Sequence, residues 1–373
     1  MTGPLDGLRI IELAGIGPAP FAAMMLADHG AEIIRIERPG RLKLPDDPVE
    51  RGRTVLPLDL RNQAHRELLL DLVENADALI DPYRPGRIEA LGIGADVLQQ
   101  RNPRLVIGRL SGYGQHGPLS QKAGHDINYL AISGLLDAFG TRKGRPLPPA
   151  NLVADYGGGA MMLLFGMLAA LWEVRGGAER GRVVDAAMVE GSALLGTMLA
   201  GMRAAGLWRD GRERNMLDGG MALYNTYKCS DGRYLAVGAI EPAFARAFLL
   251  PLDLADSSLF GDPLDRDAWA DQREIIADRI AAHPLAHWLD VYEGKDACVS
   301  PVLSPREAAG HRQAQARKAF VGAGERLIPA PAPRYAADPL EAPPLYRSQV
   351  PRARAFLEAE GVDDALIEDI LKS

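Results

Sequence analysis

Three ionisable side chains stand in sequence contexts that suit the removal and return of a proton. His125 lies in a glycine-rich loop directly before Asp126, Asp155 stands shortly before an apolar segment, and Glu241 follows a strand-like apolar run. Histidine and carboxylate side chains are common general bases, because burial and neighbouring charges tune their pKa values towards neutrality. These three residues are therefore the candidate catalytic groups.

Three consecutive glycines, Gly157–Gly159, follow Asp155 at the start of an apolar run that predicts a helix from about Tyr156 to Val174. A helix cap alone would explain the aspartate, but each glycine costs about 0.5–1 kcal/mol relative to alanine in a helix. We therefore expect a ligand to approach the N-terminus of this helix, where free N–H groups would stabilise an oxyanion. The carboxylate beside it could move a proton or act as a nucleophile.

Strands and helices alternate over about the first 110 residues, with helical segments predicted at Phe21–His29, Ala64–Asn75 and Ile88–Arg101. This alternation predicts an α/β fold with a parallel sheet covered by helices on both faces. Ligands of such sheets bind at the carboxyl ends of the strands. The predicted strands are Leu8–Leu13, Ile33–Ile36, Val55–Leu58, Ala78–Ile80 and Leu105–Ile107.

The chain has 373 residues, more than one hydrophobic core usually serves, so we expect two domains. A Rossmann-like large domain is expected over residues 1–205, completed by the C-terminal tail 345–373. A linker over 206–220 would lead to a small α+β domain over 221–304. Residues 305–344, rich in Pro, Ala and Arg, would form the return linker.

Composition argues against several classes of protein. The net charge is −7 and Lys and Arg form no dense run, so neither nucleic acid nor a membrane is expected as a partner. Cys229 and Cys298 are too few for a disulfide framework or a metal cluster. The longest apolar stretch, Ala160–Trp172, is too short to span a bilayer, and no secretory signal opens the chain. We therefore expect a cytoplasmic protein.

A dinucleotide-binding pattern at the amino terminus is incomplete. Gly15 and Gly17 follow the first predicted strand, and Glu37 stands where a ribose-binding carboxylate belongs. However, Pro20 occupies the place of the third glycine, and together with Pro18 it removes N–H donors that would cradle a pyrophosphate. The sequence favours a plain strand-to-helix turn here.

Several short motifs, spread over nearly the whole chain, resemble those of the α-methylacyl-CoA racemases. These enzymes are a branch of the type III CoA-transferase family, to which carnitine and formyl-CoA transferases also belong. The number and the order of the motifs carry the resemblance. The most specific are Glu12–Pro18, Tyr83–Gly86, Ala123–Asn128, Asn151–Gly159, Val184–Val189, Asn215–Gly220 and Ala239–Pro242.

The resemblance implies the interlocked homodimer of the type III CoA-transferase fold, with the active site at the dimer interface. His125 and Asp155 would come from the large domain of one subunit, and Glu241 from the small domain of its partner. The implied reaction inverts the α-carbon of a 2-methylacyl-CoA thioester by proton transfer through an enolate. It needs no metal and no cofactor, since coenzyme A is part of the acyl-CoA substrate.

Racemisation of this kind needs one base on each face of the α-carbon. The resemblance implies that His125 serves one face, with its pKa raised by Glu241, and that Asp155 serves the other. The thioester oxygen would lie at the N-terminus of the helix that begins with the three glycines. The supporting residues would be Asp126, Asn151, Tyr224 and Gly157.

Coenzyme A calls for arginines and an aromatic side chain near the carboxyl ends of the second, third and fourth strands. The expected contacts are Arg38, Arg61, Tyr83, Arg84 and Arg87. The family usually has Arg or Lys where this chain has Ala90, and Arg87 would replace that contact. The sequence does not identify the acyl group of the substrate. Its pocket is expected near Ile127, Leu217, Met221 and Ile240.

Two other functions compete with the racemase. A CoA-transferase of the same family would use Asp155 as a nucleophile that forms an anhydride with the acyl group and then a thioester with coenzyme A. A non-catalytic CoA-binding protein would need none of the three ionisable groups. The transferase needs no histidine base, so the presence of His125 together with Glu241 favours the racemase.

Overall fold

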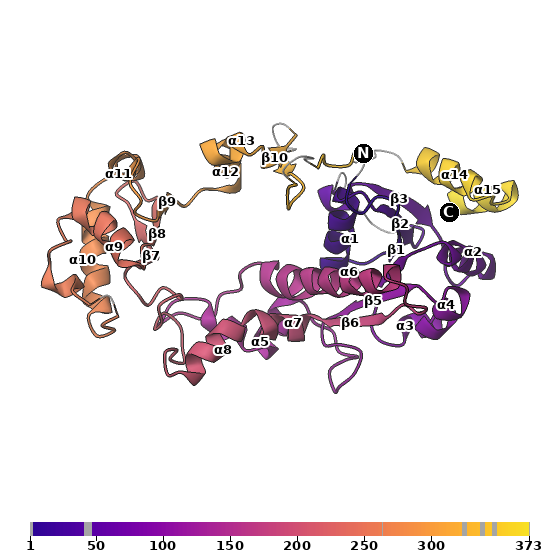
Figure 1. Ribbon diagram of the computed structural model, residues 1–373, viewed down its shortest axis with the longest axis horizontal. Coiled ribbons are helices and arrows are strands. Elements are labelled where there is room, and N and C mark those ends of the chain that lie inside the picture. The colour runs from indigo at the N-terminus through magenta and orange to yellow at the C-terminus, as the bar shows by residue number, and fades with distance from the viewer. Residues whose placement is uncertain are drawn as a thin grey trace. The chain divides into compact units, whose positions relative to one another are not determined.

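The computed structural model describes residues 3–40, 47–262, 264–322, 327–335, 340–344 and 349–372. The chain divides into two compact units, which are drawn in Figure 1. Unit 1 comprises Met1–Ser133, Ala150–Leu195 and Ala316–Ser373, and unit 2 comprises Gly134–Pro149 and Gly196–Gln315. Parts of the predicted return linker and tail, at 323–326, 336–339, 345–348 and 373, lie outside the described residues.

The core of unit 1 is a six-stranded parallel sheet in the order β3-β2-β1-β4-β5-β6. The five strands predicted over the first 110 residues are all present, and the edge strand β6 comes from later in the chain. Ile10 and Ile11 point to opposite faces of β1 and are both fully buried, as a sheet covered on both sides requires. The strands are β1 Arg9–Leu13, β2 Glu32–Glu37, β3 Arg53–Pro57, β4 Ala78–Asp81, β5 Val106–Ser111 and β6 Val183–Ala187.

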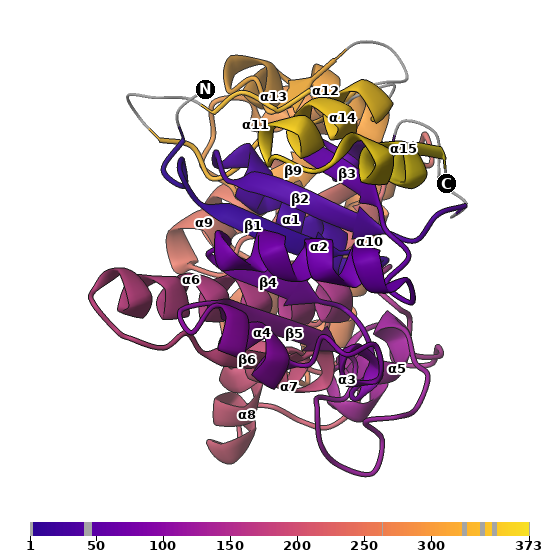
Figure 2. The same cartoon turned by 90° about the vertical axis from the view of Figure 1, so that its right-hand side faces the viewer.

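Helices cover both faces of this sheet (Figure 2). On one face lie α1 (Pro18–Asp28) and α6 (Met161–Arg175). On the other face α2 (Gln63–Glu74), α4 (Ala95–Arg101) and the C-terminal helices pack on one apolar core. The C-terminal helices are α14 (Val350–Ala359) and α15 (Asp364–Lys372). The α/β fold class is therefore confirmed.

Two predicted helices differ from those observed. The segment Ile88–Arg101 forms two helices, α3 (Arg87–Ala90) and α4, because Gly92 adopts a φ of +76° between them. The helix expected from Tyr156 instead begins at Leu152, and its first part, Leu152–Ala160, is a π-helix (η3) that runs directly into α6.

Together η3 and α6 form one helical segment, Leu152–Arg175, of 24 residues. Among the described residues it is the single helix whose length and composition would suffice to cross a membrane, and half of its most apolar window is buried inside the protein. The expectation that no stretch is long enough is therefore wrong. The segment packs against β5 and β6, as a helix that covers a sheet does.

Smaller elements complete unit 1. Helix α5 (Asp126–Ile132) and helix α7 (Met188–Leu195) both pack against η3. A single 3₁₀ turn, Pro48–Glu50, precedes β3. The described part of the chain after unit 2 contains the short strands β10 Phe320–Val321 and β11 Ile328–Pro329.

Unit 2 is a small α+β unit with its own apolar core. Its antiparallel sheet has the order β7-β8-β9, with strands β7 Tyr224–Lys228, β8 Tyr234–Gly238 and β9 Val299–Pro301. Its helices are α8 Thr197–Ala204, α9 Pro242–Leu249, α10 Trp269–Ala281, α11 Leu285–Tyr292, α12 Pro305–Gly310 and, across the unit boundary, α13 Arg312–Ala316. The 3₁₀ turns are η2 Leu135–Ala138, η4 Leu250–Leu252 and η5 Ser258–Phe260.

Candidate functional site

A cavity of unit 1, with a volume of about 610 Å³, lies at the carboxyl ends of the central strands. The loops after β1, β4 and β5, the start of α5 and the start of η3 form its wall. His125 and Asp155, which are 30 residues apart in the sequence, both line it. Other lining residues are Ile16, Gly17, Tyr83, Arg84, Ser111, Lys122, Asp126 and Asn151.

Asp155 lies in the first turn of η3, and the cap position of that helix belongs to Asn151. The Asn151 amide donates to Asp155 Oδ2 over 3.4 Å. Half-burial raises the pKa of the Asp155 carboxyl; the bond from Asn151 and the charge of His125 oppose the shift, and the charge of Asp126 adds to it. Asp155 is thus a carboxylate whose affinity for a proton is greater than in water, as a general base requires.

His125 is the residue directly before α5 and is exposed in the single chain. Its backbone N–H donates to Asn128 Oδ1 over 3.0 Å, and the preceding carbonyl of Gly124 accepts from the Tyr129 hydroxyl. A Cβ at Gly124 would lie 2.7 Å from the Tyr129 ring, so only glycine fits there. The loop that carries the imidazole is therefore fixed by its own helix.

Asp126 joins the two candidate bases. Its Oδ2 accepts the backbone N–H groups of Ala154 and Asp155, both over 2.8 Å, and its side chain is buried. The residue next to His125 thus holds the backbone of Asp155. Its other oxygen, Oδ1, is buried without a hydrogen-bond partner among the described residues.

The three glycines after Asp155 face α7. A Cβ at Gly158 would lie 2.6 Å from Ser192 N, and one at Gly159 would lie 2.8 Å from Met188 Cγ. A Cβ at Gly157 would lie 3.1 Å from Leu195 Cδ1. None of the three lines the cavity among its described residues. Close packing of η3 on α7 therefore explains the glycines, and the interpretation of Gly157–Gly159 as a cradle at a helix N-terminus is wrong, because the helix begins a full turn earlier.

Gly17 is a cavity residue whose role the sequence analysis missed. It adopts a φ of +68° at the start of α1, and a Cβ on it would lie 3.2 Å from Asp155 Oδ2. A side chain at this position would therefore crowd the carboxylate. Glu37, the candidate ribose ligand, is buried and accepts from Arg35 Nε over 3.1 Å, which agrees with the rejection of a dinucleotide site.

A second cavity of about 210 Å³ lies beside the first. Tyr83 lines both cavities, which places its side chain between them. Four of the five predicted CoA contacts line the second cavity, and the fifth, Arg84, lines the first. The four are Arg38, Arg61, Tyr83 and Arg87. Arg61 pairs with Asp59 over 2.7 Å, and this bond holds the pKa of the Asp59 carboxyl well below its usual range.

Glu241 and Tyr224 belong to unit 2. Glu241 is exposed at the residue before α9, and Tyr224 is the first residue of β7 and is 38% exposed. Tyr224 and Leu217 line a cavity of about 660 Å³ that lies wholly within this unit. Met221, expected near the acyl chain, is instead buried in the core of unit 2.

No group of three or more His, Cys, Asp or Glu side chains that could hold a metal ion occurs among the described residues. Cys229 is buried and Cys298 is exposed, and both are free.

Known proteins resemble this chain over most of its length. Residues 5–353 match the model of CoA-transferase family III. The chain is 43% identical over 336 residues to an alpha-methylacyl-CoA racemase of Mus musculus, covering 90% of this chain and 87% of the relative. It is 41% identical over 330 residues to an alpha-methylacyl-CoA racemase of Homo sapiens, covering 88% of this chain and 86% of the relative.

A crystal structure of a CAIB/BAIF family protein from Brucella suis has the same fold. Its TM-score is 0.80 at 20% identity, over 96% of this chain and all of that one. The family match covers most of the sequence, and the relatives above match at more than 40% identity. This chain belongs to CoA-transferase family III.

Proposed function

We propose that this protein is a racemase of 2-methylacyl-CoA thioesters. The observation that carries the proposal is that a histidine and a carboxyl of raised pKa, His125 and Asp155, line one cavity and are held together through Asp126. The relatives named as alpha-methylacyl-CoA racemases support the same reaction.

In the proposed mechanism one base removes the α-proton of the thioester. The electron pair of the C–H bond forms the Cα=C bond of an enolate, and the carbonyl π pair moves onto oxygen. The conjugate acid of the opposite base then returns a proton to the other face, which inverts the carbon. His125 serves one face and Asp155 the other. In each turnover the base that removes the proton becomes protonated, and the opposite residue, which was protonated at the start, becomes deprotonated.

The enolate oxygen needs donors close to both bases. We place it at the start of α5, where the N–H groups of Asp126 and Ile127 precede the first intrahelical bonds of that helix. Helix α5 begins directly after His125, and Asp126 lines the cavity. This position replaces the one expected from the glycine run.

Coenzyme A would extend from the first cavity into the second. Its nucleotide would lie among Arg38, Arg61 and Arg87, and its pantetheine arm would pass Tyr83, which lines both cavities. Arg84 would contact coenzyme A in the first cavity. Arg87 would supply the cation that the family usually has at the position of Ala90.

We also propose that the active protein is an intertwined homodimer in which Glu241 of the second subunit orients His125. The support from this chain is an exposed apolar face on η3 and α6: Phe165 is 74% and Trp172 is 80% exposed, and Leu152 and Met161 are exposed in the same segment. A soluble protein rarely leaves such a face uncovered. In this assembly unit 1 is the large domain, and Tyr224 lies in the small domain with Glu241.

The test incubates single enantiomers of several 2-methylacyl-CoA thioesters with the protein in D₂O, without an acceptor acid. Mass spectrometry follows deuterium at the α-carbon, and chiral chromatography follows inversion. We expect deuteration coupled to inversion. Turnover that requires an added carboxylic acid would instead identify a transferase with Asp155 as nucleophile, and binding without exchange would identify a non-catalytic CoA-binding protein.

A further inference from the structure

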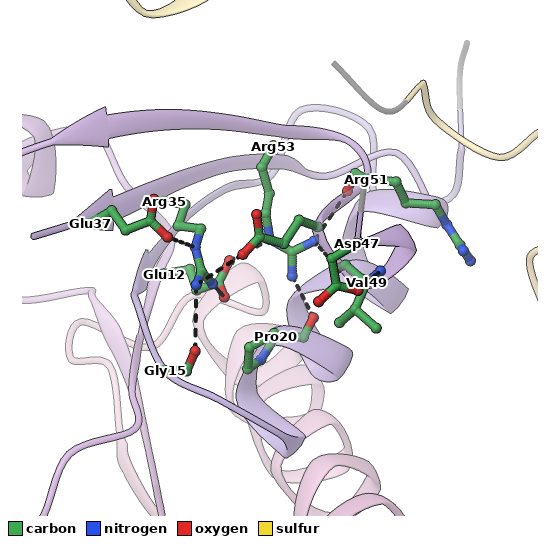
Figure 3. Close-up of polar contacts among 10 residues, drawn as sticks. Glu12, Gly15, Pro20, Arg35, Glu37, Asp47, Val49, Arg51 and Arg53 are labelled. Carbon is green, nitrogen blue, oxygen red and sulfur yellow. Dashed lines mark hydrogen bonds and ion pairs between the residues drawn. The ribbon is translucent and has the colours of Figure 1, made fainter. Parts of the chain in front are cut away.

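A cluster of fully buried charges lies beneath the loop between β1 and α1 (Figure 3). Glu12 on β1 accepts through one carboxylate oxygen from Arg35 on β2 and through the other from Arg53 on β3, the latter over 2.6 Å. All three side chains are completely inaccessible to solvent. We call Glu12, Arg35 and Arg53 the buried triad.

Both arginines of the triad also donate to backbone carbonyls on either side of Gly17, one in this loop and one in the first turn of α1. Arg35 Nη2 donates to Gly15 O over 3.4 Å, and Arg53 Nη2 donates to Pro20 O. Figure 3 shows the two guanidinium groups between the carboxylate of Glu12 and these carbonyls. Two guanidinium groups thus donate to the backbone of the segment that leads into α1, and both are held in place by the carboxylate of Glu12.

The other side of this loop is the wall of the cavity at Asp155. Gly17 lines that cavity with Asp155, and a Cβ on it would lie 3.2 Å from Asp155 Oδ2. Phe21, one turn into α1, stacks on Tyr156 with a centroid distance of 4.4 Å. The triad does not line the cavity among its described residues, so it reaches Asp155 only through the loop.

Stability alone gives a weak reason for such a cluster. Taking three charged groups out of water is costly, and apolar side chains of similar volume often serve a core as well or better. A bidentate guanidinium does, however, fix the position of the groups that it contacts more narrowly than an apolar contact does. The triad therefore suits a position where a loop must be held within a fraction of an ångström.

We propose that Glu12, Arg35 and Arg53 are positioning residues for the Asp155 face of the reaction, because they hold the Gly15–Pro20 loop against the catalytic carboxylate. The loop shields Asp155 from water on one side and limits where its oxygens can lie. This role rests on the proposed racemase function. It predicts that damage to the triad affects proton transfer by Asp155 more than proton transfer by His125.

The test uses Arg35→Lys, which keeps the positive charge beside Glu12 but loses the planar fork that reaches the Gly15 carbonyl. Deuterium incorporation is measured from each enantiomer of 2-methylacyl-CoA separately, and Asp155→Ala identifies the enantiomer that Asp155 deprotonates. We expect Arg35→Lys to slow exchange of that enantiomer about tenfold more than exchange of the other, the scale of a small misplacement of a reacting group. The KM for acyl-CoA should change little.

A pH profile gives a second readout, one that a general loss of stability would not produce. Burial is the main cause of the raised pKa of Asp155. A looser loop admits water, lowers this pKa, and so moves the acid limb of kcat/KM for the Asp155-facing enantiomer to lower pH. Arg53→Lys, which keeps the charge beside Glu12 but loses the planar fork that reaches the Pro20 carbonyl, should shift the same limb if Arg35→Lys does not fold.

The matched control is Asp28→Asn. Asp28 and Arg51 form a buried pair with an Nε–Oδ1 distance of 2.6 Å at the opposite end of α1. This control should lower stability and affect both enantiomers equally. If wild type exchanges neither enantiomer, the proposed function is wrong. If wild type exchanges both and Arg35→Lys and Arg53→Lys each slow both equally with no shift of the acid limb, the positioning role is wrong while the function stands.

Discussion

The carboxylate of Asp126 accepts a hydrogen bond from the backbone N–H of Asp155 over 2.8 Å. Asp126 follows His125 in the chain and begins α5, whereas Asp155 lies in η3. Because the same oxygen also accepts from Ala154 N, this single side chain ties the segments of the two candidate bases together. The spacing of the bases is therefore set by a contact that a change at Asp126 would remove.

Asp126→Ala should lower racemisation of both enantiomers by similar factors, because it loosens both segments at once. It also leaves two buried N–H groups unpaired, which should reduce the free energy of unfolding by about 1–3 kcal/mol. Urea denaturation and the exchange assay measure the two effects. Ser304→Ala, which removes the cap of α12, is the control: it should reduce stability without changing exchange, and an equal loss of activity in it would contradict the argument.

Arg38→Ala and Arg84→Ala should raise the KM for acyl-CoA and leave kcat nearly unchanged, because coenzyme A is bound alike in the ground and transition states. Arg101→Ala is the control, since Arg101 pairs on the surface with Glu67 and Asp71, away from both cavities. Steady-state kinetics decide the matter. A fall in kcat at constant KM in either variant would show that coenzyme A does not bind where we place it.

The raised pKa of Asp155 carries a prediction about stability. A carboxyl whose pKa is higher in the folded than in the unfolded protein supports folding fully below the unfolded value, and this support is lost as the pH rises through the folded pKa. Asp155→Asn should therefore melt at a higher temperature than wild type at pH 7.5, and the difference should shrink towards pH 4.

The pH dependence of stability should have the opposite sign at Asp59, whose pKa is lowered chiefly by its hydrogen bond with Arg61. Asp59 contributes stability above its unfolded pKa and loses it as the pH falls through the folded value. Thermal melts of Asp59→Asn should therefore approach those of wild type on acidification. Trends of the same sign for both variants would contradict the assignment of these pKa shifts.

The homodimer proposal predicts complementation between inactive chains. Glu241→Gln and Asp155→Asn chains, mixed equally, should give half heterodimers, each with one intact site of two, and hence about one quarter of wild-type activity. Native mass spectrometry would establish that heterodimers are present. Activity no higher than that of the parent variants, with heterodimers present, would mean that Glu241 and Asp155 act within one subunit.

The sequence predicted the sheet of unit 1 well because strands buried on both faces are rich in apolar residues, as Leu8–Leu13 and Ile33–Ile36 are despite the charges of Arg9, Glu12 and Arg35. It did not predict the π-helix at Leu152–Ala160, since apolar periodicity cannot distinguish it from an α-helix when glycines fill one side. Those glycines are required by close packing against α7, a helix later in the sequence that contacts them only in the tertiary fold.

His125 and Asp155 stand out through their local sequence contexts. Their place in one cavity came from the resemblance of their motifs, because nothing in a spacing of 30 residues predicts a shared cavity. The buried triad could not be foreseen either. Glu12, Arg35 and Arg53 are charged residues on three strands, and their pairing follows from the order β3-β2-β1 of the sheet. Gly17 stood in a dinucleotide pattern and in one of the family motifs, whereas its place beside Asp155 in the cavity appears only in the fold.

The most direct measurement of the two-base mechanism compares α-proton exchange from each pure enantiomer in His125→Ala and Asp155→Ala. Each variant should lose racemisation by roughly 10²-fold or more, the scale of losing a general base. We expect each to retain exchange, without inversion, mainly for the enantiomer whose proton faces the remaining base, so that the two variants show opposite preferences. Equal loss of exchange for both enantiomers in both variants would contradict the assignment of His125 and Asp155 to opposite faces.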